Sequence, residues 1–323
     1  MGNKHFLAIE DLTAKELNAY LALAKKLKAE WRARGNKALL KNKTLGMVFQ
    51  KPSLRTRVSF DMAMLHLGGQ ALYLSPNEIG LGQREGIADV SRVLARYVDG
   101  IMARVFDHAH VVELAKFSSV PVINGLSDWE HPCQALADVL TIIEHCGKLK
   151  GVKVVLVGDG NNVARSLMFA CALGGANFVC ASPHGFWLDE KSVASAGRMA
   201  EETGGSVALT ESPQKAAEGA DVIYADVWAS MGQESEAETR KKIFAPYQVN
   251  RALFIPAKPK AIVMHCLPAH RGLEITDDIM DGPHSVVFDQ AENRMHAQKA
   301  IVATLMGTKP GTRKIAKTTK RKS

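Results

Sequence analysis

The sequence predicts an α/β protein of two doubly wound domains, each with a central parallel sheet, joined by helices. Short apolar runs alternate with segments of helical periodicity along the whole chain. Many of the apolar runs are continuous rather than alternating, which is typical of strands buried on both faces in a parallel sheet. The length of 323 residues also fits two domains better than one.

The predicted strands form two groups along the chain. The first group comprises residues 44–49, 71–74, 100–104 and 121–124, and the second comprises residues 152–158, 177–181, 206–209, 222–226, 261–266 and 286–289. Between the groups, residues 134–146 are good helix formers, and a polar turn follows at 147–151. We therefore expect a first domain over residues 1–147, a second over 148–290, a C-terminal helix over 291–307 and a basic, disordered tail over 308–323.

The positive charge of the chain is concentrated in this tail. Seven of the eight excess positive charges lie in residues 309–323, which contain no acidic residue. Pro310, Gly311 and several threonines give the tail the composition of a disordered segment, and it has no aromatic side chain for stacking on bases. A solvated or partner-tethering extension is therefore expected, without specific nucleic-acid binding.

The sequence shows no targeting or membrane-spanning pattern, and we expect a cytoplasmic protein. No apolar run approaches the roughly 20 residues that cross a bilayer, and residues 1–10 resemble neither a signal peptide nor a transit peptide. The five cysteines have no CxxC or Cys/His metal spacing, so no metal is expected. Four lie in apolar surroundings typical of buried thiols. Cys266 differs because it ends the predicted strand 261–266, and α/β enzymes place chemistry at such strand ends.

Residues 51–60, Lys-Pro-Ser-Leu-Arg-Thr-Arg-Val-Ser-Phe, predict an oxyanion site. They follow the strand 44–49 and begin a helix with Val58, Met62 and Leu65 at helical spacing. The start of a helix presents free N–H groups and a positive dipole end. Ser53 and Thr56 add hydroxyl groups, and Arg55 and Arg57 add charged forks suited to phosphate oxygens. The alternative is a capped surface helix with two solvated arginines.

Residues 152–164 imitate a dinucleotide-binding turn, because a strand ends in Gly158-x-Gly160 before a helix. Val163 and Ala164 stand near the place of the third glycine, however, and the next strand ends in Ser182-Pro183 without an acidic residue for a ribose. We therefore expect no nicotinamide or other cofactor. The loop is better interpreted as part of a second substrate site, where the Asn162 amide offers both a donor and an acceptor.

Three further segments complete a pattern. They are His-Pro-Cys-Gln-Ala-Leu-Ala-Asp at 131–138, Asp-Val-Trp-Ala-Ser-Met-Gly at 226–232 and His-Cys-Leu-Pro at 265–268. Together with Ser-Leu-Arg-Thr-Arg at 53–57, they resemble the aspartate and ornithine carbamoyltransferase family in order and spacing, over residues 6–306. The last two segments resemble its ornithine-specific members, since the aspartate-specific ones have His-Pro-Leu-Pro at the second place.

The resemblance implies transfer of a carbamoyl group from carbamoyl phosphate to L-ornithine, giving citrulline and phosphate. Arg104 and His131 would polarise the carbonyl group, and Gln134 would hold the carbamoyl nitrogen. The residues expected to bind carbamoyl phosphate are Ser53, Leu54 through its backbone, Arg55, Thr56, Arg104, His131, Gln134, Cys266, Leu267 and Arg294. The residues expected to bind ornithine are Asn162, Asp226, Ser230 and Met231.

For the attacking amine, the candidates are Asp226 and Cys266. A carboxylate would hold the amine, and a thiolate whose pKa is lowered by neighbouring cations would accept its proton. The alternative for Cys266 is an ordinary buried thiol. The resemblance makes Arg104, His131, Asp226 and Cys266 the expected catalytic residues.

Several features stay open at the level of sequence. The family forms trimers with sites at subunit interfaces, and a loop of the neighbouring subunit reaches the carbamoyl phosphate. Gly80 stands where many members have Gln or His and cannot make this side-chain contact, so the contribution of the neighbouring subunit is left open, with Gln83 and Arg84 as the candidate substitutes. Another amine, putrescine or an acylated ornithine, is the alternative acceptor, and a catalytically silent homologue is the alternative class. The residues fit arginine synthesis and arginine breakdown alike, and we take synthesis as the working hypothesis.

Overall fold

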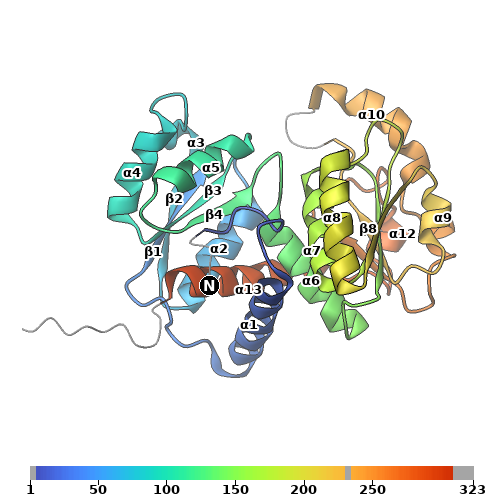
Figure 1. The fold of residues 1–323 in the computed structure, drawn as a ribbon, viewed down its shortest axis with the longest axis horizontal. Coiled ribbons are helices and arrows are strands. Elements are labelled where there is room, and N and C mark those ends of the chain that lie inside the picture. The colour runs from blue at the N-terminus through green and yellow to red at the C-terminus, as the bar shows by residue number, and fades with distance from the viewer. Residues whose placement is uncertain (1–4, 230–233, 308–323) are drawn as a thin grey trace, which may run out of the picture.

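The structure, a computed structural model, describes residues 5–229 and 234–307 and has two lobes, each built around a parallel sheet (Figure 1). The first sheet has the strand order β2-β1-β3-β4 and the second has the order β7-β6-β5-β8-β9. Every pairing within the two sheets is parallel. The predicted fold class is therefore confirmed.

The strands of the first lobe are β1 Thr44–Phe49, β2 Gln70–Leu74, β3 Gly100–Arg104 and β4 Val122–Leu126. Those of the second are β5 Lys153–Val157, β6 Asn177–Ala181, β7 Ser206–Thr210, β8 Val222–Ala225 and β9 Ile262–His265. Interior strands such as β3 are buried throughout, whereas the edge strands β2 and β7 are partly exposed along their length. Burial on both faces thus holds for the sheet interiors and fails at these edges.

The helices are α1 Ala14–Arg34, α2 Leu54–His66, α3 Pro76–Ile79, α4 Ile87–Tyr97, α5 His108–Phe117, α6 Pro132–Cys146, α7 Asn162–Gly174, α8 Glu190–Thr203, α9 Pro213–Ala217, α10 Ala237–Phe244, α11 Arg251–Phe254, α12 Asp277–Met280 and α13 Val287–Met306. Short 3₁₀ segments lie at Glu234–Glu236 and Ala245–Tyr247. None of the described helices is long and apolar enough to cross a membrane.

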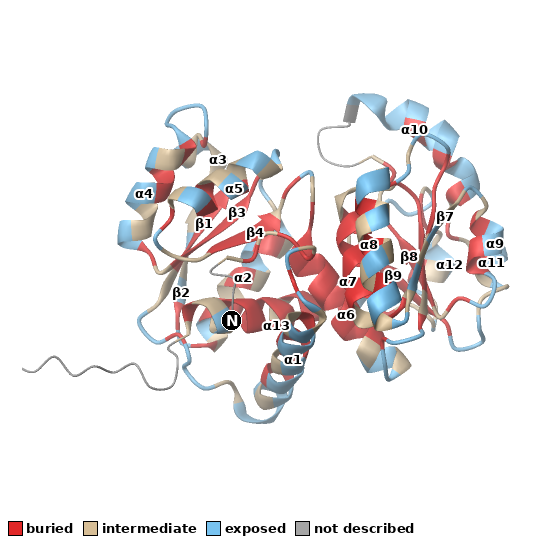
Figure 2. Cartoon of the chain, viewed as in Figure 1, coloured by how far each residue is buried: buried red, intermediate tan, exposed pale blue. Residues whose placement is uncertain are grey.

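Helix α6 connects the lobes, as the sequence predicted. Its first eleven residues, from Pro132 to Ile142, are all buried, and with α7 it forms the buried region between the two sheets (Figure 2). The helix ends at Gly147, whose φ of 77° is a left-handed conformation that glycine adopts without strain. The continuous burial of α6 requires partners on all sides, and these come from both lobes.

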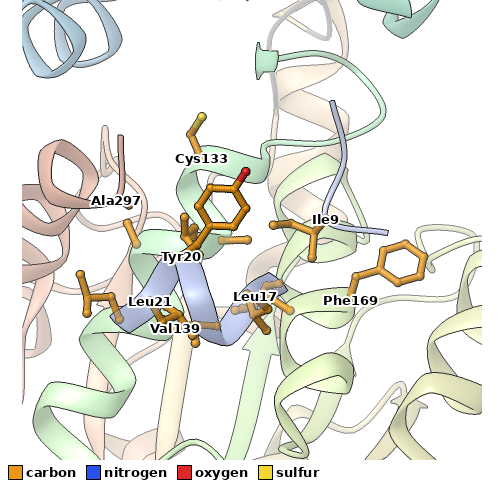
Figure 3. Packing of buried hydrophobic residues seen from close by; sticks show 14 of the residues in the cluster. Ile9, Leu17, Tyr20, Leu21, Cys133, Val139, Phe169 and Ala297 are labelled. Carbon is orange, nitrogen blue, oxygen red and sulfur yellow. The ribbon is translucent and has the colours of Figure 1, made fainter. Parts of the chain in front are cut away.

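One hydrophobic cluster continues across the lobes (Figure 3). It combines Leu17 and Tyr20 of α1 with Val139 of α6, Phe169 of α7 and Ala297 of α13. Burying a large apolar side chain contributes roughly 1.5–3 kcal/mol, so this shared core makes a substantial contribution to holding the lobes together.

The strand predicted at 286–289 is wrong. Val286 is the N-cap of α13, which runs for 20 residues and packs on α6, α1 and α2. A short apolar run does not distinguish a strand from the start of a buried helix, and here Val287 is buried while Phe288 is exposed. The expected boundary between residues 290 and 291 falls inside this helix.

The predicted apolar face of α2 is also different. Val58 and Leu65 are 47% and 62% exposed, whereas Phe60, Ala63 and Met64 are buried. The helix carries apolar residues on two faces, and periodicity alone does not say which one meets the core.

The five cysteines are free; Cys133, Cys171 and Cys180 are buried and the other two are partly buried.

A buried lysine lies where α13 packs on α1. Lys299 is fully buried; its Nζ donates to Asn36 Oδ1 at 2.8 Å and lies 4.7 Å from the centroid of the Trp31 ring. Burial lowers the pKa of Lys299 to about 8. Between pH 8 and the ordinary lysine pKa, the unfolded chain therefore binds a proton that the folded chain does not.

We expect the wild type to gain stability relative to a Lys299→Met variant as the pH rises from 8 to 10. The slope is up to about 1.4 kcal/mol per pH unit, because stability rises with pH wherever the unfolded state binds more protons. Denaturant unfolding at several pH values measures this difference. A constant difference over this range would contradict the lowered pKa of Lys299.

Candidate active site

A cavity of about 470 Å³ opens between the lobes. Nine residues predicted from the sequence line it: Ser53, Arg55, Arg104, His131, Asn162, Asp226, Cys266, Leu267 and Arg294. Leu54, Thr56 and Gln134 are not part of the lining, and Ser230 and Met231 lie outside the described residues. The structure thus brings motifs from the whole chain to one place.

The phosphate motif forms the start of α2. Ser53 is the N-cap, and its Oγ accepts from Thr56 N at 3.4 Å. The N–H groups of Leu54 and Arg55, at the first two helix positions, have no acceptor within the helix. The Leu54 side chain is 76% exposed, so only its backbone is placed for anion binding. Arg57 is not at the cavity; its guanidinium lies 4.3 Å from the Tyr73 ring centroid.

Thr56 joins two arginines rather than lining the cavity. Its Oγ1 accepts from Arg104 Nη1 at 3.2 Å and from Arg294 Nη2 at 3.1 Å. Arg104 is the last residue of β3, Arg294 lies in the second turn of α13, and all three side chains are buried. One hydroxyl group therefore holds two guanidinium groups that come from distant parts of the chain.

The arginines create a strongly positive region. Burial, followed by the charges of Arg294 and Arg55, lowers the pKa of Arg104 to about 9. Burial also lowers the pKa of Arg294, and Arg55 adds to the effect. Like charges held together in a cavity are costly, and an anion bound among them offsets that cost.

His131 stands at the start of α6 as its N-cap. Its backbone N donates to Ser166 Oγ at 2.8 Å, and its Nδ1 is buried without a partner among the described residues. Burial, with the charges of Arg294 and Arg104, lowers the pKa of His131 well below the ordinary value. The imidazole is therefore neutral at physiological pH and can donate from one ring nitrogen while the other accepts.

Gln134 lies one helical turn after His131. Its Nε2 donates to Asp138 Oδ1 at 2.8 Å. Its Oε1 is buried and has no partner within the described parts of the chain. An unused buried amide oxygen is costly without a ligand, since such groups normally have a hydrogen-bond partner.

Asp226 and Cys266 meet on the side of the second lobe. They directly follow the neighbouring strands β8 and β9, whose carboxyl ends lie at the same sheet edge. Cys266 Sγ donates to Asp226 Oδ1 at 2.9 Å, and Asn161 Nδ2 donates to Asp226 Oδ2 at 2.7 Å. Asn161 was not among the residues predicted from the sequence, although asparagine before a helix start is a common N-cap.

The expected thiolate at Cys266 is wrong for this site. Burial, then the charge and hydrogen bond of Asp226, raises the pKa of Cys266 well above its usual value. The charge of Arg294 acts in the opposite direction but is a smaller effect. A thiol that donates to a carboxylate does not accept a proton, so Cys266 supports Asp226 instead.

The turn after Cys266 is held by a buried histidine. Leu267 has a φ of 59°, which is strained for a residue with a side chain. Its N–H donates to His265 Nδ1 at 2.9 Å, and His265 Nε2 lies 3.1 Å from Glu274 Oε1. The Nδ1 of His265 accepts here, so Nε2 carries the proton and donates to Glu274.

The loop that imitates a dinucleotide turn has a different use. The Asn161 side chain caps α7 by accepting from Val163 N and Ala164 N, and so occupies the N–H groups that a pyrophosphate would need. A Cβ at Gly160 would lie 2.5 Å from Leu188 N, so this glycine permits a close backbone approach. Asn162 Nδ2 donates to Ser127 O at 2.6 Å and links the loop to the first lobe.

An ion pair that the sequence did not reveal also lines the cavity. Arg240 Nη1 donates to Asp159 Oδ2 at 2.8 Å and to Trp228 O at 3.1 Å. Both charged side chains are nearly buried, and the Arg240 guanidinium lies 4.9 Å from the centroid of the Phe186 ring. The pair ties α10 to the loop that follows β5.

The side chain of Arg84 makes its hydrogen bond within the loop around Gly80. Gly80 has a φ of 50° and ends α3, and a Cβ there would lie 2.8 Å from Arg84 Cβ. Arg84 Nη1 donates to Glu78 O at 3.2 Å. Glycine is therefore required by the tight turn, and Arg84 is engaged within its own loop.

A carboxylate, an imidazole and a thiol, which are all possible metal ligands, lie close together at this sheet edge. Ligand atoms of Asp226, His265 and Cys266 lie within 4.8 Å of one another. The hydrogen bonds described above already use both His265 nitrogens and the thiol, so we assign no metal to them.

A buried arginine cluster that faces a carboxylate and a thiol across an interlobe cavity defines a two-substrate α/β enzyme of the transferase type. The chain belongs to the aspartate/ornithine carbamoyltransferase family. The model of its carbamoyl-P binding domain matches residues 4–144, and the model of its Asp/Orn binding domain matches residues 150–305.

Individual relatives are similar to this chain in sequence and structure over nearly its whole length. The anabolic ornithine carbamoyltransferase of Pyrococcus furiosus is 58% identical over 308 residues, which cover 95% of this chain and 98% of the relative. The ornithine carbamoyltransferase of Bacillus subtilis is 52% identical, with 94% of each chain covered. The solved structure of the Pyrococcus furiosus enzyme has a TM-score of 0.92 over 94% of this chain and 98% of its own. That of Thermus thermophilus has a TM-score of 0.85 at 43% identity, over 95% and 100%.

The raised pKa of Cys266 predicts slow alkylation. At pH 7.5 iodoacetamide should modify Cys266 at least about tenfold more slowly than glutathione, because the thiolate is the reactive form. Peptide-resolved mass spectrometry measures the rate, and an Asp226→Asn variant, which removes the negative charge, should react faster. A Cys266 as reactive as a free thiol would restore the thiolate interpretation.

Proposed function

We propose that this protein is an ornithine carbamoyltransferase. It transfers the carbamoyl group of carbamoyl phosphate to the δ-amine of L-ornithine and releases L-citrulline and phosphate. The observation that carries the proposal is the meeting of the anion site of the first lobe with Asp226 and Cys266 in one cavity. Relatives that are 50–59% identical and have the name ornithine carbamoyltransferase support it.

The phosphate group binds at the start of α2. The Ser53 hydroxyl, the N–H groups of Leu54 and Arg55, and the Arg55 fork are its donors, with the positive end of the helix behind them. Thr56 acts in the free site by holding Arg104 and Arg294. As the carbon–oxygen bond to phosphate breaks, this region stabilises the negative charge on the leaving phosphate.

The carbonyl oxygen of the carbamoyl group is stabilised by Arg104 and the neutral His131. Both are fixed before the substrate arrives, so little reorganisation accompanies the developing charge. The unpartnered Gln134 Oε1 accepts from the carbamoyl NH2, and Arg294 and the Leu267 backbone complete the site.

The ornithine amine approaches from the second lobe. Asp226 and Asn162 hold the amino acid, and we assign Ser230 and Met231 to the same substrate. The positive charges of Arg104 and Arg294 disfavour an ammonium group beside them and so favour the neutral amine. Its lone pair attacks the carbonyl carbon, the carbon–oxygen bond to phosphate breaks, and the proton lost from the amine nitrogen passes to the leaving phosphate. Cys266 keeps Asp226 in place by donating to Oδ1.

We further propose a cytoplasmic homotrimer that works in arginine biosynthesis. Five free cysteines fit a reducing compartment, and the anabolic role in the name of the Pyrococcus furiosus relative fits biosynthesis. The exposed apolar side chains Leu54, Val58 and Leu65, which are spread along α2, support burial against a second subunit, and sedimentation analysis of the mass tests this. We retain the domain division near residue 147 as part of this proposal. The basic tail over residues 308–323 lies outside the described residues, and we keep for it a role without specific nucleic-acid binding.

A citrulline assay tests the reaction. With carbamoyl phosphate as donor, the protein should form citrulline from ornithine, and should give far less product with putrescine or acetylornithine. The alternative acceptors lack, respectively, the α-carboxylate or the charged α-amine that an amino-acid site recognises. Equal or greater activity with either amine would establish the alternative, and no product with any amine would favour a silent homologue.

An Arg55→Ala variant is the matched test of the donor site. Its affinity for carbamoyl phosphate should fall at least about tenfold, because a charge-assisted hydrogen bond to a partly desolvated phosphate contributes about 1.5–3 kcal/mol. The exposed Arg57→Ala variant in the same helix turn is the control and should bind normally. Calorimetry that shows unchanged affinity in Arg55→Ala would place Arg55 outside the site.

A further inference from the structure

We propose that Asp138 is a positioning residue that fixes the amide of Gln134, and that it thereby gives the site its preference for an acyl phosphate with an NH2 group over one with a methyl group. This inference rests on the proposed function and adds to it a residue that does not touch the substrate. It follows from the hydrogen bonds around one buried carboxylate.

Asp138 is fully buried in α6, one turn after Gln134. Its Oδ1 accepts from Gln134 Nε2 at 2.8 Å and from Gln290 Nε2 at 2.7 Å. Its Oδ2 accepts from the Tyr224 hydroxyl at 3.1 Å. A carboxylate in such surroundings needs several donors, and here each of the three comes from a different element.

The hydrogen bonds leave Gln134 one orientation. An oxygen that already accepts from Gln290 can only accept from Gln134, so the NH2 end of Gln134 must face it. The orientation of Gln290 is fixed independently, because its Oε1 accepts from His265 N at 2.9 Å and a backbone N–H can only donate. Both amide orientations therefore follow from the chemistry of their partners rather than from the shape of the side chains.

The other end of the Gln134 amide is then its oxygen. It is buried and has no partner in the described chain. Gln134 does not itself line the cavity of the free site, but it lies one helical turn behind His131, which does. An acceptor at this position complements a carbamoyl NH2 and offers nothing to a methyl group. With the amide reversed, two N–H groups would face each other and binding would be weakened.

Burying a carboxyl group at position 138 has a free-energy cost, so a role in filling space alone does not explain why the residue is an aspartate. Burial raises the pKa of Asp138 to about 7, although the hydrogen bonds of Gln134, Gln290 and Tyr224 oppose the shift. An apolar residue of similar volume would fill the space without this penalty. A proton on Oδ2 would face the Tyr224 hydroxyl and would leave Oδ1 an acceptor, so the orientation of Gln134 holds in both protonation states.

The test compares two stable phosphonates that differ only at the group in question. Phosphonoacetamide has an NH2 group, and 2-oxopropylphosphonate has a methyl group in its place. Calorimetry gives both dissociation constants for each variant. Asp138→Leu should weaken phosphonoacetamide about tenfold and change 2-oxopropylphosphonate less than about twofold, since only the amide contact is lost.

Two matched variants separate positioning from structure. Asp138→Asn keeps an oxygen where Gln134 and Gln290 donate, so it should retain the wild-type ratio of the two dissociation constants. Tyr224→Phe removes the third hydrogen bond of Asp138 without affecting Gln134. It should lower the thermal midpoint and leave the ratio unchanged.

A double-mutant cycle shows whether Asp138 acts through Gln134. Gln134→Leu alone should abolish the preference for phosphonoacetamide over 2-oxopropylphosphonate. Adding Asp138→Leu to this variant should not change the ratio of the two dissociation constants further. If Asp138→Leu does not fold, Asp138→Ala, which also removes the acceptor but does not overfill the site, replaces it in the cycle.

The inference is overturned if Asp138→Leu keeps the wild-type ratio, if it weakens both ligands equally, or if its effect adds to that of Gln134→Leu. Citrulline formation by the wild type is measured alongside. Its failure would refute the proposed function, whereas wild-type activity with an unchanged ratio in Asp138→Leu would refute this inference alone.

Discussion

The structure depends on holding several guanidinium groups at one end of a buried cavity. Arg104 and Arg294 share the Thr56 hydroxyl, and Arg55 adds a third positive charge close enough to lower the pKa of both. Side chains with like charges do not assemble by themselves, so the hydrophobic packing around them must fix their positions. A bound anion then offsets part of that cost, so this arrangement favours an anionic ligand. The return of α13 across α6, α1 and α2 is part of this arrangement, because it delivers Arg294.

The second half-site depends on strand order. Asp226 and Cys266 are 40 residues apart in sequence but follow adjacent parallel strands, and so their side chains meet. Helix α6 couples the two halves. It begins at the cavity with His131 as its cap, and its buried Asp138 reaches Tyr224 of β8 and, through Gln290, the backbone of His265. The buried helix α6 therefore makes hydrogen bonds with elements on both sides of the cavity.

Most of the fold was predictable because strands buried in parallel sheets leave a clear signal in sequence. Nine of the ten predicted strands exist, and the connecting helix and the motif at α2 are where the sequence placed them. The errors have physical reasons. The run at 286–289 is apolar because it begins a helix buried against the first lobe, and α2 has apolar residues on both faces, so its pattern does not show which face meets the core. Cys266 was expected to ionise because of nearby arginines, but burial and the contact with Asp226 are the larger effects.

The sequence by itself determined the fold class, the order of the elements and the residue types available for phosphate, carbonyl and amine chemistry. These are local properties, carried by periodicity, caps and short motifs. Only the tertiary structure decided which residues face the cavity and in what state. It turned Thr56 into a link between arginines, made Asn161 a partner of Asp226 and paired Arg240 with Asp159. It also left the Gln134 oxygen without a partner among the residues that the structure describes. Protonation and hydrogen-bond direction depend on burial and on groups from distant segments, so they exist only once the chain has folded.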